Sequence, residues 1–232
     1  MSIAIIPARG GSKRIPRKNI RPFCGQPMIN YAIHAALQSG CFDEVVVSTD
    51  DPEIAEIARQ CGATVPFIRD PQLADDHTGT GAVVIDAIHQ LEQLGRHSDF
   101  YCCIYATVPL IRASDLAAAF ARLQASTADF AFSAAAFGFP IQRALRLQVD
   151  GSVQPFAPEN MVRRSQDLEP AYQDAGQFYW GRREAWLEGR NLFSERGLAH
   201  VLPRYRVVDI DTDEDWRLAE LLYQALQDYD AG

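Results

Sequence analysis

The stretch "IAIIPARGGSKRIPRKN", Ile3 to Asn19, joins an apolar run to a loop rich in glycine and positive charge. The run Ile3 to Ile6, bounded by Pro7, predicts a short buried β-strand. Gly10 and Gly11 allow backbone amides to approach an anion, and the lysine and arginine side chains around them supply charge and bidentate donors. The stretch therefore predicts a strand that leads into a loop suited to a polyphosphate; the competing interpretation is a solvated basic loop with two turn glycines.

Outward from this loop, β-rich runs alternate with amphipathic helical patterns. Strands are predicted at residues 44–48, 64–68, 100–105 and 130–135, and helices at residues 27–39, 52–60, 79–94 and 114–124. This alternation predicts an α/β fold with a Rossmann-like, doubly wound, mostly parallel sheet. The loop after the first strand then lies at the carboxyl edge of the sheet, where open α/β folds bind ligands.

The alternation stops after Phe137. Residues 144–156 alternate around an Asp-Gly pair, which is typical of a hairpin, and residues 158–170 are polar and without a period. We therefore take residues 1–232 as a single domain in which residues 140–173 form a small inserted lobe. Apolar residues near the edges of this lobe would be exposed on a monomer, which predicts a homodimer.

After the lobe the pattern of strand and helix returns. Strands are expected at residues 177–181, 199–202 and 206–210. Thr212 is expected to cap a last helix that runs to Tyr229, with acidic residues in its first turn, where the helix dipole favours them.

The composition excludes several classes of protein. The chain has 232 residues, of which 47% are hydrophobic, and a formal net charge of −8. An acidic chain whose basic residues gather in one loop is a poor nucleic-acid-binding module. No apolar run is long enough to span a membrane, and the first residues resemble a strand rather than a signal peptide, so we expect a cytoplasmic protein without membrane association.

A second candidate site lies near the end of the sequence. In an extended segment, Asp209 and Asp211 point to the same face, while Ile210 points to the other. Two carboxylates on one face repel each other unless a cation lies between them, and an oxygen-only set of ligands suits Mg²⁺. The alternative is that Asp211 and Asp213 only begin the last helix.

Several stretches resemble a known family. "IPARGGSKRIPRKN", residues 6–19, and "DIDTDEDW", residues 209–216, are similar to signature motifs of the cytidylyltransferases that activate nonulosonic acids, the group that contains the CMP-sialic acid synthetases. "FCGQPMINYAI", "CCIYAT" and "RRSQDLEPAYQDAGQFYW" resemble the branch that uses pseudaminic acid. The resemblance covers essentially the whole chain.

The resemblance implies a reaction and a set of residues. The reaction is transfer of CMP from CTP to the C2 hydroxyl of pseudaminic acid, with release of pyrophosphate, for glycan biosynthesis such as flagellin glycosylation. It implies that Arg9, Lys18, Asp209 and Asp211 are catalytic, the two aspartates as Mg²⁺ ligands. The residues implied to bind the nucleotide are Ala8, Arg9, Gly10, Gly11, Ser12, Lys18, Asn19, Arg69, Thr78 and Thr80.

The sugar-binding residues follow from the same resemblance. Where the sialic acid enzymes have Gln-Pro-Thr, this chain has Tyr105, Ala106 and Thr107, a difference that disfavours N-acetylneuraminate. The residues implied to bind the sugar are Tyr105, Thr107, Arg163, Arg164, Gln166, Gln177, Phe178 and Tyr179. The lobe arginines, of which one is expected to grip the sugar carboxylate, reach across a dimer interface in the relatives.

Two alternative functions stay open on the sequence alone: the same reaction on N-acetylneuraminate, legionaminate or Kdo, and a CTP-binding regulator without catalysis. The base that removes the proton of the sugar hydroxyl is also not identified. None of the five histidines has a paired carboxylate pattern; His77, beside Asp75 and Asp76, is expected to be solvated.

Overall fold

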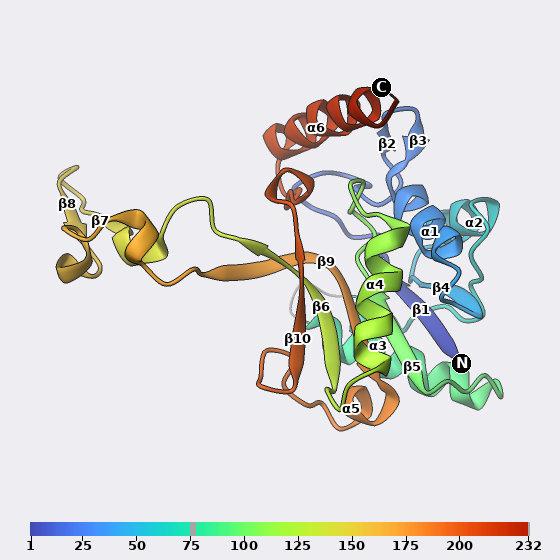
Figure 1. The fold of residues 1–232 in the computed structure, drawn as a ribbon. Helices are drawn as coiled ribbons and strands as arrows, with labels where there is room; N and C mark the ends of the chain where they lie inside the picture. The colour runs from blue at the N-terminus through green and yellow to red at the C-terminus, as the bar shows by residue number, and fades with distance from the viewer. Residues whose placement is uncertain (75–77, 232) are drawn as a thin grey trace.

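The computed structural model describes residues 1–74 and 78–231, and its centre is a mixed β-sheet. Among the described residues the sheet has six strands in the order β10-β6-β9-β5-β1-β4 (Figure 1). Their bounds are Ser2–Pro7 for β1, Glu44–Ser48 for β4, Phe100–Ile104 for β5, Phe130–Ala136 for β6, Tyr172–Arg182 for β9 and Gly197–Leu202 for β10. Neighbouring strands are parallel except that β9 runs antiparallel to β5 and β6. The mostly parallel α/β sheet expected from the sequence is confirmed.

Helices cover both faces of this sheet. Helices α1 (Met28–Ser39), α2 (Pro52–Gln60) and α4 (Ala113–Gln124) share one hydrophobic cluster with the sheet, and α3 (Thr80–Gln93) and α5 (Arg183–Leu187) share the other. The strand β1 contributes to both hydrophobic clusters because its alternate residues point to opposite faces of the sheet. Ala4 and Ile6 belong to the first cluster, and Ile3 and Ile5 belong to the second. The predicted doubly wound arrangement is therefore present, with helix positions close to the sequence-based ones.

The last helix, α6 (Asp213–Ala231), lies outside these two layers (Figure 1). It packs through Trp216 and Ala219 against Phe23 and Met28, which come from the start of the chain. The Asp215 amide donates to Thr212 Oγ1 at 3.2 Å, so the predicted cap of this helix is confirmed. No helix among the described residues is both long enough and apolar enough to cross a membrane.

Two predicted strands are wrong. Residues 206–210 form no ladder: Arg206 ends a short 3-10 helix, and the alternating apolar side chains that follow pack into side-chain clusters instead. Residues 64–68 contribute only an isolated bridge between Val46 and Thr64, because Pro66 cannot donate to a ladder. The remaining short elements are β2 (Pro22–Phe23), β3 (Gln26–Pro27), β7 (Leu145–Leu147), β8 (Val153–Pro155), η1 (Pro71–Leu73), η2 (Ile141–Arg143), η3 (Pro158–Asn160), η4 (Ser165–Asp167) and η5 (Arg204–Arg206).

The segment between β6 and β9, residues 137–171, projects from the body as an arm (Figure 1). Its hairpin pairs Leu145–Leu147 with Val153–Pro155, as the Asp-Gly turn predicted. Apolar side chains stand out from it, with Phe139 88% and Val162 89% exposed. The expected lobe at residues 140–173 overlaps this arm, without its first three residues and with the first two residues of β9.

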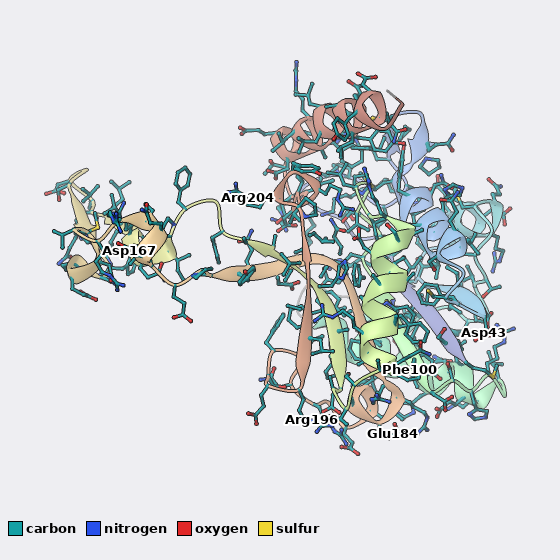
Figure 2. The ribbon with its side chains drawn as sticks, in the orientation of Figure 1. Asp43, Phe100, Asp167, Glu184, Arg196 and Arg204 are labelled. Carbon is teal, nitrogen blue, oxygen red and sulfur yellow. The ribbon has the colours of Figure 1, made fainter. Side chains whose placement is uncertain are left out.

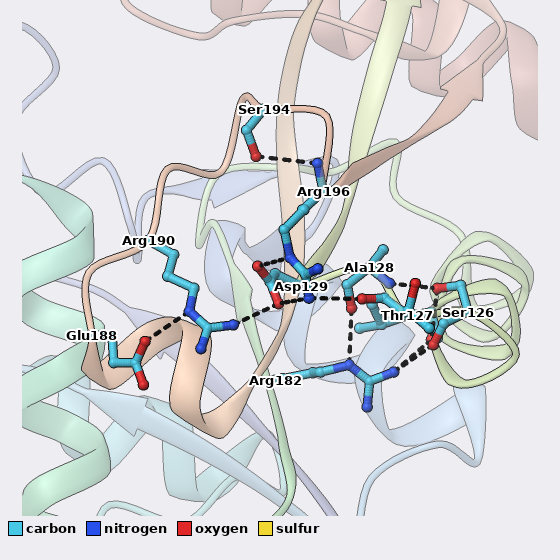
Figure 3. A network of polar contacts seen from close by, with 10 residues as sticks. Ser126, Thr127, Ala128, Asp129, Arg182, Glu188, Arg190, Ser194 and Arg196 are labelled. Atoms are coloured by element: carbon cyan, nitrogen blue, oxygen red, sulfur yellow. Dashed lines mark hydrogen bonds and ion pairs between the residues drawn. The ribbon is translucent and has the colours of Figure 1, made fainter.

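A network of ion pairs fixes the opposite, amino edge of β6 (Figure 3). The Asp129 carboxylate, with 3% of its side chain exposed, accepts from Arg190 Nη1 at 2.8 Å and from Arg196 Nε at 2.6 Å. Arg182 donates nearby to the Ala128 carbonyl at 2.9 Å. The network joins the loop between α5 and β10 to the start of β6.

Candidate active site

The basic loop after β1, residues 8–19, is held by contacts with its neighbours. The Ala8 amide donates to the Ser48 carbonyl at 2.9 Å, and Asn19 Nδ2 donates to the Arg9 carbonyl at 2.9 Å. The Gly10 amide donates to Asp50 Oδ1 at 3.0 Å, so this amide is directed at a carboxylate. The loop is therefore an ordered structure whose shape is set by β4 and by its own far end.

The side chains of this loop line a cleft of about 300 Å³, which we call the basic cleft. Of the residues expected to bind the nucleotide, Ala8, Gly10 and Gly11 are not among those that line it. The predicted residues that line the cleft are Arg9, Ser12, Lys18, Asn19, Arg69, Thr78, Thr80, Tyr105 and Thr107. Residues separated by almost a hundred positions thus meet in one hollow at the carboxyl edge of the sheet.

Arg69 is the most buried cation of the cleft. It is 3% exposed, and its Nη2 donates to the Ser48 carbonyl at 2.8 Å. Its Nε atom has no hydrogen-bond partner among the described residues. Burial lowers the pKa of this guanidinium, and the nearby Asp50 opposes that shift. A fixed cation in the lining of the cleft suits a ligand that presents hydrogen-bond acceptors.

The acidic segment at residues 209–211 meets the basic loop. Lys18 Nζ donates to the Ile210 carbonyl at 2.6 Å and lies 3.5 Å from Asp211 Oδ1. Arg14 Nη1 lies 2.6 Å from the other carboxylate oxygen of Asp211. Burial and the negative charge of Asp211 raise the pKa of Asp209, against the opposing effect of Lys18 and Arg14. The structure therefore brings together Lys18, Asp209 and Asp211.

The donor set fits a magnesium ion. Burial and the charge of Asp211 disfavour the ionised form of Asp209, and a divalent cation beside Asp209 and Asp211 would favour it. Among the residues that the structure describes, no group of three or more His, Cys, Asp or Glu side chains is placed to hold a metal. At phosphate sites, Mg²⁺ is commonly held by one or two carboxylates, and water and substrate oxygens occupy its remaining coordination positions.

A second hollow of about 350 Å³, the acidic cavity, adjoins the basic cleft. The two share Tyr105 and Thr107, and Asp209 and Tyr179 line the acidic cavity. Tyr179 donates its hydroxyl to Asp174 Oδ2 at 2.6 Å, and burial is the largest cause of its raised pKa. Tyr105 and Thr80 hydroxyls lie 3.3 Å apart. Tyr105 and Thr107 thus face both of the adjoining hollows.

Five predicted sugar-binding residues lie away from this cavity. Phe178 is fully buried in the hydrophobic core, and Gln177 is 3% exposed and donates from Nε2 to the Arg206 carbonyl at 2.6 Å. Arg163, Arg164 and Gln166 lie on the arm, and Arg164 pairs with Asp167, which Figure 2 shows at the far end of the arm. His77 and its acidic neighbours lie outside the described residues. The two arginines therefore do not reach the cleft of their own chain.

Two residues of the site were missed at the level of sequence. Arg14 was counted only as part of the charge of the loop, although it makes the shortest contact with Asp211. Asp174 lines the acidic cavity and accepts from Tyr179. The spacing of five residues on a single strand gives no pairing signal, because the irregular backbone near Gly176, with φ of 62°, brings the two side chains together.

Comparisons with known proteins agree with this geometry. The cytidylyltransferase family model matches residues 3–225. A pseudaminic acid cytidylyltransferase of Campylobacter jejuni is 48% identical over 223 residues, covering 96% of each chain. A CMP-N,N'-diacetyllegionaminic acid synthase of Legionella pneumophila is 33% identical over 233 residues, covering 97% of each chain.

A solved structure supports the fold. The CMP:2-keto-3-deoxy-manno-octonic acid synthetase complexed with CTP superposes with a TM-score of 0.71 at 19% identity, covering 98% of this chain and 99% of that one. At that identity the likeness concerns the fold. Taken with the family model and the close relatives, these findings show that the chain belongs to the cytidylyltransferase family.

Proposed function

We propose that this enzyme transfers CMP from CTP to the C2 hydroxyl of pseudaminic acid, giving CMP-pseudaminate and pyrophosphate. The observation that supports it most is the 48% identity with the Campylobacter jejuni enzyme over 96% of both chains. The cations that line the basic cleft suit the triphosphate, and the hydroxyls and carboxylates of the acidic cavity suit the hydroxyl and acylamino groups of the sugar, whose own carboxylate needs a cation from outside this lining. We assign CTP to the basic cleft and the sugar to the acidic cavity, with the reaction in the cytoplasm, where CTP is available.

The residues of the cleft have defined tasks in this scheme. Arg9, Arg14 and Lys18 bind the triphosphate and offset the charge that develops at the α-phosphorus, and Arg69 contributes to holding the nucleoside. Tyr105 and Thr107, shared by both hollows, hold the sugar hydroxyl in line with the bond that breaks. A bound Mg²⁺, held by Asp209 and Asp211, would supply polarisation of phosphate and sugar oxygens.

We further propose that two copies form a homodimer through their arms. The exposed Phe139 and Val162 support this assembly, since single chains rarely leave such residues in water together. Arg163 and Arg164 would then serve the acidic cavity of the partner copy, which accounts for their distance from the cleft of their own chain.

The test is pyrophosphate release with CTP and Mg²⁺, comparing pseudaminate, N-acetylneuraminate, legionaminate and Kdo at equal concentrations. We expect selective turnover of pseudaminate, lost in the Asp209→Ala, Asp211→Ala double variant. Preference for another acid would keep the cytidylyltransferase chemistry and overturn the substrate assignment. CTP binding without release of pyrophosphate from any acid would instead support a regulator.

A further inference from the structure

The segment that carries Asp209 and Asp211 has no strand pairing to fix it. Residues 207–212 follow η5 and precede α6, and no ladder includes them. A backbone without ladder hydrogen bonds has to be positioned by other contacts if its carboxylates are to keep a defined geometry. Both ends of the segment have such contacts, but the kind of contact differs between the two ends.

The carboxyl-terminal end is fixed locally. The Asp211 and Thr212 amides donate to Asp215 Oδ2 at 3.1 Å and 2.8 Å, an arrangement within the first turn of α6. Ile210 is 1% exposed in the cluster that also contains Trp216. These contacts orient Asp211 but leave the backbone before Asp209 unspecified.

The amino-terminal end is fixed by a buried ion pair. Arg206 is 6% exposed, and its Nη1 donates to Asp115 Oδ2 at 2.5 Å. The other carboxylate oxygen of Asp115 lies 3.0 Å from His200 Nε2. Asp115 stands in the first turn of α4, a rigid helix that follows β5, so the pair ties the segment to the carboxyl edge of the sheet.

The same arginine is held a second time through its backbone. Gln177 Nε2 donates to the Arg206 carbonyl at 2.6 Å, and both residues are buried. Gln177 lies in β9, the strand next to β5. Arg206 is therefore fixed at its side chain by α4 and at its carbonyl by β9, three positions before Asp209.

We infer that Asp115 and Gln177 are positioning residues, which through Arg206 set where Asp209 stands relative to Asp211 and so determine the affinity of the pair for a divalent cation. The inference rests on the proposed metal-binding role of these two aspartates. Loss of a residue that orients metal ligands typically weakens metal binding roughly 10- to 100-fold. A residue that only stabilises the fold would not change metal affinity in the protein that remains folded.

The test uses Mn²⁺ as the probe, titrated by electron paramagnetic resonance into the full-length protein with CTP, with binding by CTP alone subtracted. Asp115→Asn is compared with Asp129→Asn, which removes the charge of another buried aspartate, in the arginine network at the amino end of β6 (Figure 3). We expect Asp115→Asn to weaken Mn²⁺ binding about 10-fold or more and to raise the Mg²⁺ concentration for half-maximal rate, with the KM for CTP nearly unchanged. Asp129→Asn is expected to bind Mn²⁺ as the wild type does.

Gln177→Leu is the second variant, since it removes the hydrogen bond to Arg206 without leaving an unpaired charge. It keeps the test decisive if Asp115→Asn does not fold, because it too is expected to weaken Mn²⁺ binding. Wild-type affinity in the folded variants, or equal loss in Asp129→Asn, would overturn the inference. Absence of Mn²⁺ binding by the wild type would instead overturn the metal part of the proposed function, and the inference with it.

Discussion

The Asp209 carboxylate is placed where its negative charge is unfavourable. Its side chain is exposed, but loss of part of its solvation and the negative charge of Asp211 both raise its pKa. Lys18 and Arg14 oppose the shift without cancelling it. Such uncompensated charge is typical of residues retained for function, because the fold alone would be more stable without it.

We therefore expect Asp209→Asn to change stability and activity in opposite directions. Removing the charge relieves the repulsion from Asp211, so the melting temperature at pH 7 should rise slightly, since solvent screens the charge of this exposed side chain. The value of kcat/KM should fall by about 10²-fold or more, since the proposed metal site loses one of its two carboxylates. Calorimetry and pyrophosphate release measure the two effects; a melting temperature that falls would contradict the electrostatic account.

The two adjacent glycines of the basic loop differ in the space around them. A Cβ atom on Gly10 would lie 2.6 Å from Asp51 Oδ2, whereas one on Gly11 would meet nothing within 4 Å. Asp51 caps α2 by accepting from the amides of Glu53 and Ile54, and it pairs with Arg17. A side chain at Gly10 therefore disturbs the junction between the loop and α2.

Gly10→Ala and Gly11→Ala form a matched pair for this reason. Gly10→Ala is expected to lower the free energy of unfolding by about 1–3 kcal/mol and to raise the KM for CTP, because the loop has to shift. Gly11→Ala should change stability by less than about 0.5 kcal/mol. Urea denaturation of both variants measures the difference, and equal stability of the two would contradict the packing at Gly10.

At the scale of elements, aromatic side chains join α6 to the chain that directly follows the basic loop. The Phe23 ring meets those of Trp216 and Tyr223 edge to face at 5.5 Å and 5.7 Å, and Arg21 lies 4.5 Å above the Trp216 ring. The cluster holds the helix that begins after the acidic segment against the chain that follows the basic loop. Packing of two elements, rather than their own propensity, thus brings the two charged segments together.

The arm exposes several large apolar side chains. Replacing Phe139 and Val162 together by serine should shift a homodimer to a monomer, because burial of these side chains would be the main gain on association. Size-exclusion chromatography with light scattering measures the mass. Val201→Ser, at a half-exposed position on β10, serves as the control and should remain dimeric. A wild type that is already monomeric would reject the proposed dimer.

At the scale of the whole molecule, several carboxylates are paired with cations and have lowered pKa values. Hydrogen bonds from Arg17, Arg183 and Arg196 lower those of Asp51, Glu92 and Asp129 respectively. For Asp115, burial raises the pKa, but the contacts with His200 and Arg206 outweigh it. These groups lie on different elements, so their protonation affects the entire fold.

Stability should accordingly fall in acid. A carboxyl group with a lowered pKa in the folded state stabilises the protein above its unfolded pKa, about 4 for Asp and Glu, and this contribution is lost as the pH falls below that value. The urea midpoint should therefore be nearly constant from pH 7 to about pH 5 and drop between about pH 4 and pH 3. Asp209 has the opposite sign and offsets a part of the loss. A midpoint that is independent of pH down to pH 3 would contradict the assignment.

The sequence was sufficient to predict the elements that depend on a local pattern of apolar residues. Apolar periodicity placed the helices 52–60 and 114–124 within a residue of their observed bounds. It failed at residues 206–210, where Val208 and Ile210 alternate as in a strand but pack against Trp216 instead of a neighbouring strand. The contact that Gln177 makes could not be predicted from the sequence either, because only the tertiary structure shows that its side chain meets Arg206, 29 positions away.

The contact between Lys18 and the Ile210 carbonyl joins positions 192 residues apart. During synthesis at roughly 5–20 residues per second, some 10–40 s pass between the emergence of the two partners from the ribosome. The first strand and its basic loop exist through that interval without the acidic segment that completes the site. A nascent chain therefore lacks the contact between the basic loop and the acidic segment until synthesis has nearly ended.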